Sequence, residues 1–326
     1  MRYIENDSID PYFNLALEEY LLGFGIKEDV LLLWQNDSAV VVGRYQNTLQ
    51  EINEQFCREH SIRIVRRNTG GGAVYHDLGN LNFSIITDYT QGDDITFGRF
   101  LRVICDALRK LGVNAELQGR NDLVVGGLKI SGSAQTIHGN RILHHGTLLC
   151  CTDLYMLSGA LQNDLSKFAS KSTASVKSRV ANIKDINAAV SVDSLKNSII
   201  SEFGSSAPLE RQALTEAASD AVRLLRDNKY DTWQWNYGES PDFNFEKKTR
   251  FPHGMITVNL IVEEGIISKC AITGDFLGCM DICDIEKSLV GTRQLYYDVA
   301  ACISRFDTSL YFGGIPSEDV AGCFFC

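Results

Sequence analysis

Apolar residues recur at helical spacing in several segments of the chain. Pro11 follows Asp10, a pair typical of a helix N-terminus, because the carboxylate can cap the first turn and proline already has a helical φ. Apolar residues then fall on one face over residues 11–22, which predicts an amphipathic helix. The same spacing predicts a helix over residues 97–111 that ends at Gly112. Further helices are expected over residues 153–161, 192–203, 207–227, 281–289 and 293–304.

Short aliphatic and β-branched runs lie between these helices and are typical of strands. Predicted strands cover residues 31–34, 39–43, 62–65, 81–86, 123–125, 128–135 and 141–150, and later 255–262 and 265–272. Gly139-Asn140 joins two of them as a hairpin. Because strands and helices alternate without a repeating βαβ rhythm, the pattern favours an α+β fold with mixed or antiparallel β-sheets flanked by helices.

The turn-rich segment 233–241 divides this pattern into two parts. A chain of 326 residues is also long for a single hydrophobic core. We therefore expect a large catalytic domain over residues 1–243 and a small α+β accessory domain over residues 244–326.

The composition narrows the possible partners and the compartment. A formal charge of −10, from 31 basic and 41 acidic residues, argues against general nucleic-acid binding. The chain contains no apolar run of membrane-spanning length and no apolar signal core in its first residues. Ten cysteines in such a chain are typical of reduced thiols, so we expect a cytoplasmic protein without membrane partners. A zinc site is a weaker alternative for four of them, whose spacing matches no common zinc motif: Cys279, Cys283, Cys323 and Cys326.

Three consecutive glycines, Gly70–Gly72, directly follow Arg66, Arg67 and two polar residues. Glycines are poor helix and strand formers, so a triplet indicates that the backbone approaches something closely. Consecutive N–H groups form an anion-binding concavity, and arginine adds bidentate hydrogen bonds. An anion site competes here with a simpler interpretation, a glycine-rich turn beside solvated arginines.

Lys129 lies in an apolar, strand-forming stretch among small residues. Strand alternation predicts that it shares a face with Ser131 and Ser133, which leaves room for a ligand above it. The alternative is an edge-strand lysine that discourages aggregation. Asp122, just upstream, is a candidate magnesium ligand or simply a turn residue.

Histidines supply the remaining candidate chemistry. His144 and His145 are neighbours in a predicted strand and therefore point to opposite faces, so a metal site that combines both with His76 is weakly supported. Alternation also places His145 and Cys150 on opposite faces, which makes a catalytic cysteine–histidine pair awkward.

Taken together and in order, these motifs resemble lipoate–protein ligases, members of the lipoate/biotin ligase superfamily. The motifs that carry the resemblance are Arg66–Asn80, Gly119–Val125, Lys129–Ala134 and His144–Leu149. The resemblance begins at Asp10–Ala16, continues through Ser175–Ile183 and covers nearly all of residues 1–240. The tail resembles the small C-terminal accessory domain of that family.

The resemblance implies an ATP-dependent enzyme that acts in two steps. It implies activation of lipoic acid to lipoyl-AMP, followed by transfer of the lipoyl group to a lysine of lipoyl domains. The implied acceptors are the E2 subunits of 2-oxoacid dehydrogenases and the glycine cleavage H protein. ATP and Mg²⁺ are the implied cofactors. We expect a monomer without nucleic-acid or membrane partners.

The resemblance also implies roles for individual residues. Lys129 is expected to be catalytic and to contact both the lipoyl carbonyl oxygen and the phosphate. The implied ATP-binding residues are Arg67, Gly72, Ala73, Val74, Tyr75, Lys129 and Asp122, and Asp122 is also the candidate for placing Mg²⁺. The implied lipoate-binding residues are Lys129, Arg66, Gly71, His76, His145 and Trp34. Two departures affect only loop details: Asn68-Thr69 stands where the family often has Ser-Ser, and the Gly126-Gly127 link is shorter than in some relatives.

Three alternative functions share this fold. An ATP-independent lipoyl or octanoyl transferase works through a cysteine thioester, but Cys150 and Cys151 follow a strand and do not lie in a polar loop. A non-catalytic lipoate-binding homologue would be expected to lack Lys129 or the arginines, and this chain has both. A biotin ligase uses the same adenylate chemistry, but the sequence context of Lys129 and His145 favours lipoate.

Overall fold

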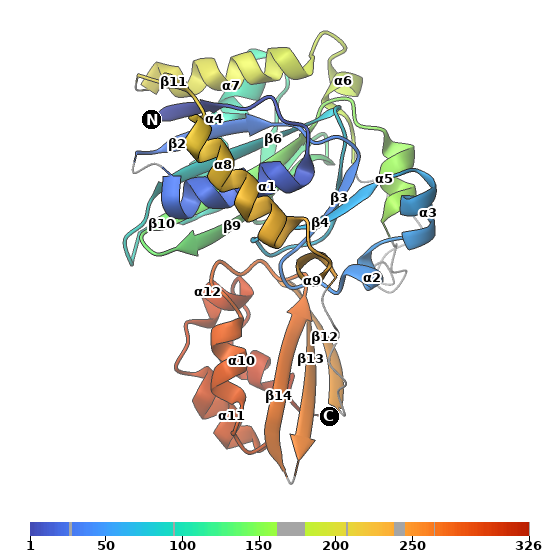
Figure 1. The fold of residues 1–326 in the computed structure, drawn as a ribbon, viewed down its shortest axis with the longest axis vertical. Helices are drawn as coiled ribbons and strands as arrows, with labels where there is room; N and C mark the ends of the chain where they lie inside the picture. The colour runs from blue at the N-terminus through green and yellow to red at the C-terminus, as the bar shows by residue number, and fades with distance from the viewer. Residues whose placement is uncertain are drawn as a thin grey trace.

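The computed structural model describes residues 1–25, 28–93, 95–161, 180–206, 208–237, 245–263 and 265–325. They form a large domain with a smaller one below it in the view of Figure 1. The strands of the large domain are β1 (Arg2–Glu5), β2 (Val30–Trp34), β3 (Ala39–Val42), β4 (Arg63–Arg66), β5 (Val74–His76), β6 (Asn80–Asp88), β7 (Glu116–Gln118), β8 (Asp122–Val125), β9 (Leu128–His138), β10 (Arg141–Leu149) and β11 (Glu210–Ala213). Its α-helices are α1 (Pro11–Tyr20), α2 (Thr48–Glu51), α3 (Glu54–Glu59), α4 (Phe97–Lys110), α5 (Leu154–Ala160), α6 (Ile183–Ile186), α7 (Val192–Ser206), α8 (Glu216–Leu225) and α9 (Trp233–Asn236).

The large domain contains two mixed sheets. An eight-stranded sheet has the order β11-β1-β2-β6-β10-β9-β8-β7, in which β1 runs parallel to β2 and β11 and the other neighbours are antiparallel. A three-stranded sheet has the order β4-β3-β5, with one parallel and one antiparallel pair. The predicted α+β class with mixed and antiparallel sheets is confirmed.

Alternation along β2 shows how the large sheet is covered. Leu31 and Leu33 pack into a core with α4 and α7, whereas Leu32 and Trp34 pack into a second core with α1 and α8. All four side chains are buried, since both faces of a strand in the middle of a helix-covered sheet lie away from solvent. In Figure 1, α1 and α8 lie in front of the sheet.

The three-stranded sheet extends the core on the α1 side. Val41 and Val65 join the cluster around α1, whereas Val40, Ile64 and Tyr75 turn to the other face, toward α3 and α5. Residues of α1 and of strands in both sheets therefore border the space between the two sheets.

The small domain is an antiparallel sheet covered by helices. Its strands are β12 (Phe245–Phe251), β13 (Gly254–Glu263) and β14 (Ile266–Gly274), and its helices are α10 (Cys283–Leu289), α11 (Tyr296–Ile303), α12 (Thr308–Phe312) and α13 (Ser317–Gly322). Apolar side chains from β13, β14 and all four helices form a separate core. The predicted boundary between residues 243 and 244 lies outside the described residues.

The loop between β14 and α10 returns to the large domain. Phe276 O accepts a hydrogen bond from Gly71 N (3.0 Å), and Cys279 O accepts one from Ile137 N (2.9 Å). Tyr45 stacks on Phe276 with ring centroids 5.0 Å apart and donates its hydroxyl to Met280 O (2.6 Å). The small domain is thus bonded to the glycine triplet itself and to β9.

One predicted helix is wrong in its first half. Residues 210–213 of the expected helix 207–227 form β11, which pairs in parallel with β1 from the N-terminus. Thr215 then caps α8 by accepting from Ala218 N, so the helix begins only at Glu216. A pairing with the first residues of the chain overrides the local helical pattern.

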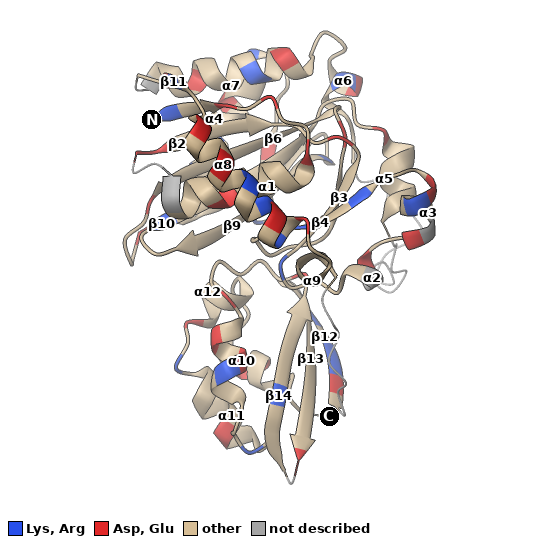
Figure 2. Cartoon of the chain, viewed as in Figure 1, with Lys and Arg blue, Asp and Glu red and all other residues tan. Residues whose placement is uncertain are grey.

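The two adjacent cysteines after β10 differ in exposure. Cys150 is fully buried, whereas Cys151 is exposed. Within the ranges given above, no three histidine, cysteine or acidic side chains are arranged to hold a metal, and Cys326 lies outside those ranges. Figure 2 shows basic and acidic residues interspersed over both domains. The helices in the described part of the chain are too short or too polar to span a membrane.

We predict that Phe276→Ala lowers the free energy of unfolding of the protein by about 3–5 kcal/mol, because it removes a fully buried ring between Tyr45 and Phe312. Urea denaturation followed by circular dichroism measures this change. Tyr297→Ala is the control: Tyr297 is 85% exposed, so its loss should change the value by less than about 0.5 kcal/mol. Equal effects of the two substitutions would contradict the assigned role of the loop.

Candidate active site

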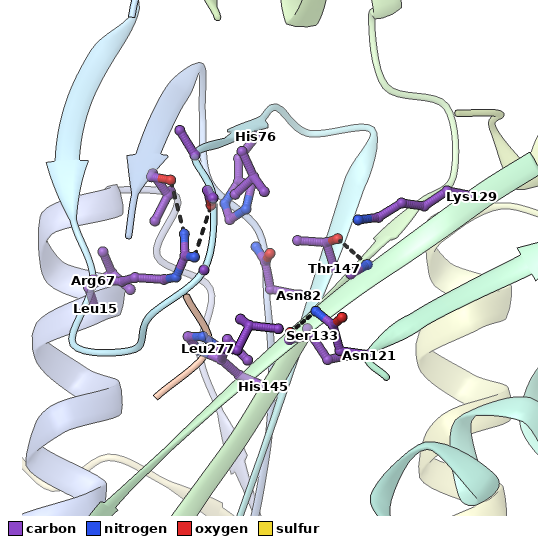
Figure 3. A pocket seen from close by; sticks show the side chains of 18 of the residues that line it. Leu15, Arg67, His76, Asn82, Asn121, Lys129, Ser133, His145, Thr147 and Leu277 are labelled. Atoms are coloured by element: carbon purple, nitrogen blue, oxygen red, sulfur yellow. Dashed lines mark hydrogen bonds between the residues drawn. The ribbon is translucent and has the colours of Figure 1, made fainter. Parts of the chain in front are cut away.

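A cavity opens between the eight-stranded sheet and the glycine triplet (Figure 3), with an empty volume of about 650 Å³ when the solvent at its open side is included. Strands β2, β6, β9 and β10 form one side, and β3, β5 and the triplet form the other. Leu15 of α1 and Leu277 of the small domain complete the lining. The lining residues are Leu15, Trp34, Val41, Arg67, Gly71, Gly72, Ala73, Val74, His76, Asn82, Asn121, Lys129, Gly132, Ser133, Ala134, His145, Gly146, Thr147 and Leu277.

Strand register assembles the floor of the cavity. Asn82 of β6 pairs with Trp34 of β2 on one side and with Thr147 of β10 on the other, so the three side chains form one row. Ser84 and His145 pair in the next row. The indole N–H of Trp34 donates to Ser84 Oγ (2.9 Å) and links the rows. Residues more than a hundred positions apart in sequence therefore meet on one surface.

The glycine triplet is held against the small domain. A Cβ on Gly70 would lie 2.6 Å from Phe276 O, and one on Gly71, whose φ is +90°, would lie 2.6 Å from Leu277 Cδ2. Side chains are therefore excluded at these two positions. Gly72 differs, because no described atom lies within 4 Å of its Cβ position. Gly72 is therefore the glycine of the triplet whose Cβ position is open space.

Arg67 is buried in the cavity wall and shapes the triplet. Its guanidinium donates to Val41 O (3.1 Å), Gly70 O (2.6 Å), Gly72 O (2.9 Å) and Thr69 Oγ1 (2.9 Å). These acceptors take four of its five N–H groups. Burial lowers the pKa of Arg67 to about 10, so the group remains cationic at neutral pH.

Arg66 lies outside the cavity. Its guanidinium donates to the backbone oxygens of Gly43 (2.9 Å), Gln46 (2.6 Å) and Trp235 (3.0 Å) and to Thr48 Oγ1 (2.6 Å). Since neighbouring strand residues point to opposite faces, Arg66 and Arg67 cannot both face the cavity. Arg66 instead fixes the segment after β3 and α9 to the end of β4.

A buried hydrogen-bonded chain runs beneath the cavity. Arg67 Nε donates to Thr69 Oγ1, which lies 2.7 Å from His145 Nε2. His145 Nδ1 lies 2.8 Å from the carboxylate of Glu18, which also accepts from Ser84 Oγ (2.6 Å). Glu18 is 2% exposed, so these hydrogen bonds, and not water, satisfy its side chain. The chain connects the glycine triplet to α1 and to the sheet.

The two other buried histidines differ in what surrounds them. Burial lowers the pKa values of His76 and His144 to about 3, so both rings are neutral at physiological pH. His76 lines the cavity, and its Nδ1 lies 3.1 Å from Asn36 Nδ2. His144 faces the opposite side of β10 and stacks on Phe100 with centroids 4.6 Å apart. The expected divergence of His144 and His145 is therefore observed.

Lys129 reaches the cavity from a different face than expected. The register between β8 and β9 shifts, so that Asp122 pairs with Gly132 whereas Val124 pairs with Lys129. The extra residue in β9 reverses the alternation. Lys129 Nζ therefore lies over Gly132, 3.0 Å from where a Cβ would be, and the predicted shared face with Ser131 is wrong. The ammonium is 2.8 Å from Asp122 Oδ1.

Most of the other predicted site residues line the cavity or lie beside it. Trp34, Gly71, Ala73 and Val74 line the cavity. Tyr75 turns its side chain to the opposite face, where its hydroxyl lies 3.1 Å from Ser38 Oγ. Asp122 lies beside the cavity through its contact with Lys129. The motif residues 175–179 lie outside the described residues.

The predicted site residues leave out several residues of the site. Glu18, Thr69 and Asn82 are buried polar residues, and Leu277 comes from the small domain. Polar residues inside apolar runs, as at Asn82 and Ser84, are the signal that was available in the sequence. No local signal points to Leu277.

Comparison with protein families and with known proteins identifies the family of this chain. A model of the lipoyl protein ligase A/B catalytic domain matches residues 10–204, and a model of the bacterial lipoate protein ligase C-terminus matches residues 240–324. The chain is 40% identical to lipoate–protein ligase 1 of Staphylococcus aureus over 323 residues, 98% of each chain. The chain belongs to the lipoate–protein ligase family and is an enzyme of this type, as the sequence motifs predict.

Solved structures agree. LipL1 of P. falciparum, crystallised in complex with lipoate, matches with a TM-score of 0.80 at 26% identity over 94% of both chains. Lipoate-protein ligase A bound with ATP matches with a TM-score of 0.61 at 31% identity, over 73% of this chain and 96% of that one.

We predict that the protein loses stability in acid partly through His144. The unfolded chain binds a proton at this residue below about pH 6.5 and the folded protein only near pH 3, so the free energy of unfolding falls as the pH is lowered through this window. The contribution is at most ~1.4 kcal/mol per pH unit. His144→Gln should show a shallower slope than the wild type in urea titrations from pH 7 to pH 4. His253→Gln, at an exposed position, is the matched control, and identical slopes for all three proteins would contradict the prediction.

Proposed function

We propose that the cavity forms lipoyl-AMP from lipoate and ATP and then passes the lipoyl group to a protein lysine. The observation that carries this proposal is that Lys129 and the Gly72–Val74 segment line the same partly apolar cavity. A carboxylate must be activated before an amine can attack it, and an acyl-adenylate provides the leaving group.

The first half-reaction brings a carboxylate to a polyphosphate. Two anions repel each other, so the site has to supply positive charge and N–H donors that are already in place. Lys129 and Arg67 are the cations of the cavity lining. Arg67 acts on the nucleotide mainly by holding the Gly70–Gly72 backbone in shape, because its own donors are occupied by carbonyl groups.

Lys129 serves both half-reactions in this proposal. Its ammonium lies in contact with Asp122 in this structure and its side chain is 39% exposed, so the ammonium can move to a substrate oxygen at little cost. A compact ammonium on a flexible stem suits a group that contacts the acyl oxygen and the phosphate in turn.

The acyl chain is assigned to the apolar part of the cavity. Leu15, Trp34, Val41 and Val74 face one another there, and Leu277 of the small domain lies against Gly71. This lining suits a chain of eight carbons that ends in a dithiolane ring. His145, held by Glu18, lines the same cavity and adds a polar group to its wall.

Magnesium is expected to arrive with ATP. Mg²⁺ in such sites uses one or two protein carboxylates together with substrate phosphates and water. Asp122 fits this requirement, because it is a half-buried carboxylate beside Lys129 and the cavity residue Asn121. When bound with ATP, the ion would neutralise phosphate charge, and Asp122 would then be shared between the ion and Lys129.

Lipoyl domains are the proposed acceptors, and those of 2-oxoacid dehydrogenase E2 subunits and of the glycine cleavage H protein are the candidates. We propose that the protein acts on them as a monomer. The described residues that line the cavity include no cysteine, which favours this route over a thioester transferase. The retained Lys129 and Arg67 favour an enzyme over a non-catalytic lipoate-binding protein.

We predict that Lys129→Met lowers the rate of pyrophosphate release from ATP and lipoate at least about 100-fold, because the cation that stabilises the developing charge is removed. A coupled pyrophosphate assay measures it, and mass spectrometry of a lipoyl domain measures the overall reaction. Lys184→Met, at an exposed lysine of α6, is the control and should retain wild-type rates. Lipoylation by the wild type without ATP would exclude the ligase assignment.

We predict that Asp122→Asn raises the Mg²⁺ concentration needed for half-maximal pyrophosphate release by about 10-fold, since a neutral amide is a weaker ligand than a carboxylate. Titration of Mg²⁺ at fixed ATP measures this shift. Excess Mg²⁺ should restore most of the rate if Asp122 acts through the ion. A lower maximal rate with an unchanged Mg²⁺ midpoint would instead show that Asp122 acts only on Lys129.

A further inference from the structure

Three cavity-lining residues carry a buried polar side-chain atom without a partner among the described residues: His76, Asn82 and Ser133. Ser133 Oγ lies 2.6 Å from the Cβ position of Gly146, on the side of the sheet where Phe83 packs, which leaves two donors for the cavity. His76 Nε2 and Asn82 Nδ2 are both inaccessible to solvent and unbonded, and both residues line the cavity. His76 is 3% exposed and Asn82 is 2% exposed. Buried polar groups are usually satisfied, so two unsatisfied donors in one cavity indicate a ligand that supplies an acceptor.

The hydrogen bonds around His76 define which nitrogen carries the proton. Asn14 Nδ2 donates to the backbone oxygens of Ser8 and Gln35 and to Asn36 Oδ1 (2.9 Å each). The amide nitrogen of Asn36 therefore points to His76 Nδ1, at 3.1 Å, which must accept. Because the ring is neutral, its proton lies on Nε2, the nitrogen without a partner.

Asn82 is oriented by its neighbour on the same face of β6. Asn80 Nδ2 donates to Asn82 Oδ1 (2.9 Å), which leaves the N–H groups of Asn82, a residue of the cavity lining, without an acceptor. Figure 3 shows His76 and Asn82 between Arg67 on one side and Lys129 on the other. Asn82 also pairs across the sheet with Thr147, which is in turn hydrogen-bonded by Gly132 N (3.4 Å), next to Lys129.

The chemistry of this pair selects an oxygen of the substrate. Asn82 Nδ2 and His76 Nε2 are uncharged hydrogen-bond donors, so they can bind an oxygen acceptor but cannot bind a cation. The cavity already contains the cations that neutralise carboxylate and phosphate. Neutral fixed donors add direction, and they contribute most where negative charge develops on a single oxygen.

We propose that Asn82 Nδ2 and His76 Nε2 bind the acyl carbonyl oxygen of the adenylate and act as an oxyanion hole when the acceptor lysine attacks. This inference rests on the proposed function and assigns groups to its second half-reaction. Asn36 and Asn80 are positioning residues, because they fix the proton of His76 and the amide of Asn82.

The step is balanced without any further reactant. The neutral amine forms a C–N bond to the carbonyl carbon, and the C=O electron pair moves to the oxygen that the two donors hold. That pair then returns, the C–O bond to phosphate breaks, and AMP leaves with the bonding electrons. The amine loses its proton to solvent or to the departing phosphate.

Measuring the two half-reactions separately distinguishes an oxyanion hole from a purely structural role of these residues. In adenylate formation the carboxylate loses charge, so donors to its oxygen favour the ground state at least as much as the transition state. Their loss should raise the KM for lipoate and leave kcat within about threefold of the wild type. In transfer the oxygen gains charge, so the loss of one donor should lower kcat by about 100-fold.

The experiment uses full-length protein and measures each half-reaction alone. Pyrophosphate release reports adenylate formation, and synthetic lipoyl-AMP with a lipoyl domain reports transfer. Asn82→Leu removes the donors, and Asn82→Asp keeps the shape but replaces the N–H groups with a carboxylate oxygen, which repels a developing oxyanion. Thr87→Val is the matched control, because Thr87 is on the same strand, has a buried hydroxyl without a partner and does not line the cavity.

The proposal is supported if both Asn82 variants lose about 100-fold in transfer kcat while Thr87→Val does not. Transfer within twofold of the wild type in Asn82→Asp would overturn it, as would equal losses of kcat in both half-reactions. If Asn82→Leu fails to fold, the aspartate variant decides alone. A wild type that releases no pyrophosphate would contradict the proposed function instead, because the transfer assay starts from supplied adenylate.

Discussion

The guanidinium of Arg67 is the constraint on which the rest of the site depends. Its donors bind Val41, Gly70 and Gly72 through their carbonyl oxygens, so one buried cation sets the course of the glycine triplet. Through Thr69 and His145 it also reaches the carboxylate of Glu18. A buried cation is tolerated only when its hydrogen bonds are made, and here making them builds the cavity wall.

The small domain contributes to this site directly. Phe276 accepts a hydrogen bond from Gly71, and Leu277 enters the cavity lining. Arg120 in the turn before β8 donates to the backbone oxygens of Gly313 and His253, which adds a second attachment beside Lys129 and Asp122. The glycines are therefore needed at two positions for a contact between domains, while Gly72 has open space at its Cβ position. Because Leu277 lines the cavity, the small domain contributes to the shape of the cavity.

The polar floor of the cavity combines charged and neutral hydrogen-bond donors. Charged donors lie at its edges, at Arg67 and Lys129, and neutral donors lie between them, at His76 and Asn82 (Figure 3). The neutral donors are fixed by other buried amides and not by water. Such preorganisation costs free energy when the protein folds and removes the need for reorganisation during the reaction.

The sequence by itself determined the fold class, the family, the glycine segment and the identity of Lys129 and Arg67 as candidate groups, because these depend on local patterns and on ordered motifs. It did not determine which of two adjacent arginines faces the cavity, which side of β9 carries Lys129, or that Glu18 and Asn82 belong to the site. It also placed a helix where β11 pairs with β1. Only the tertiary structure decided these points, because a one-residue bulge reverses alternation and because strand register brings together residues whose local sequence carries no record of their partners.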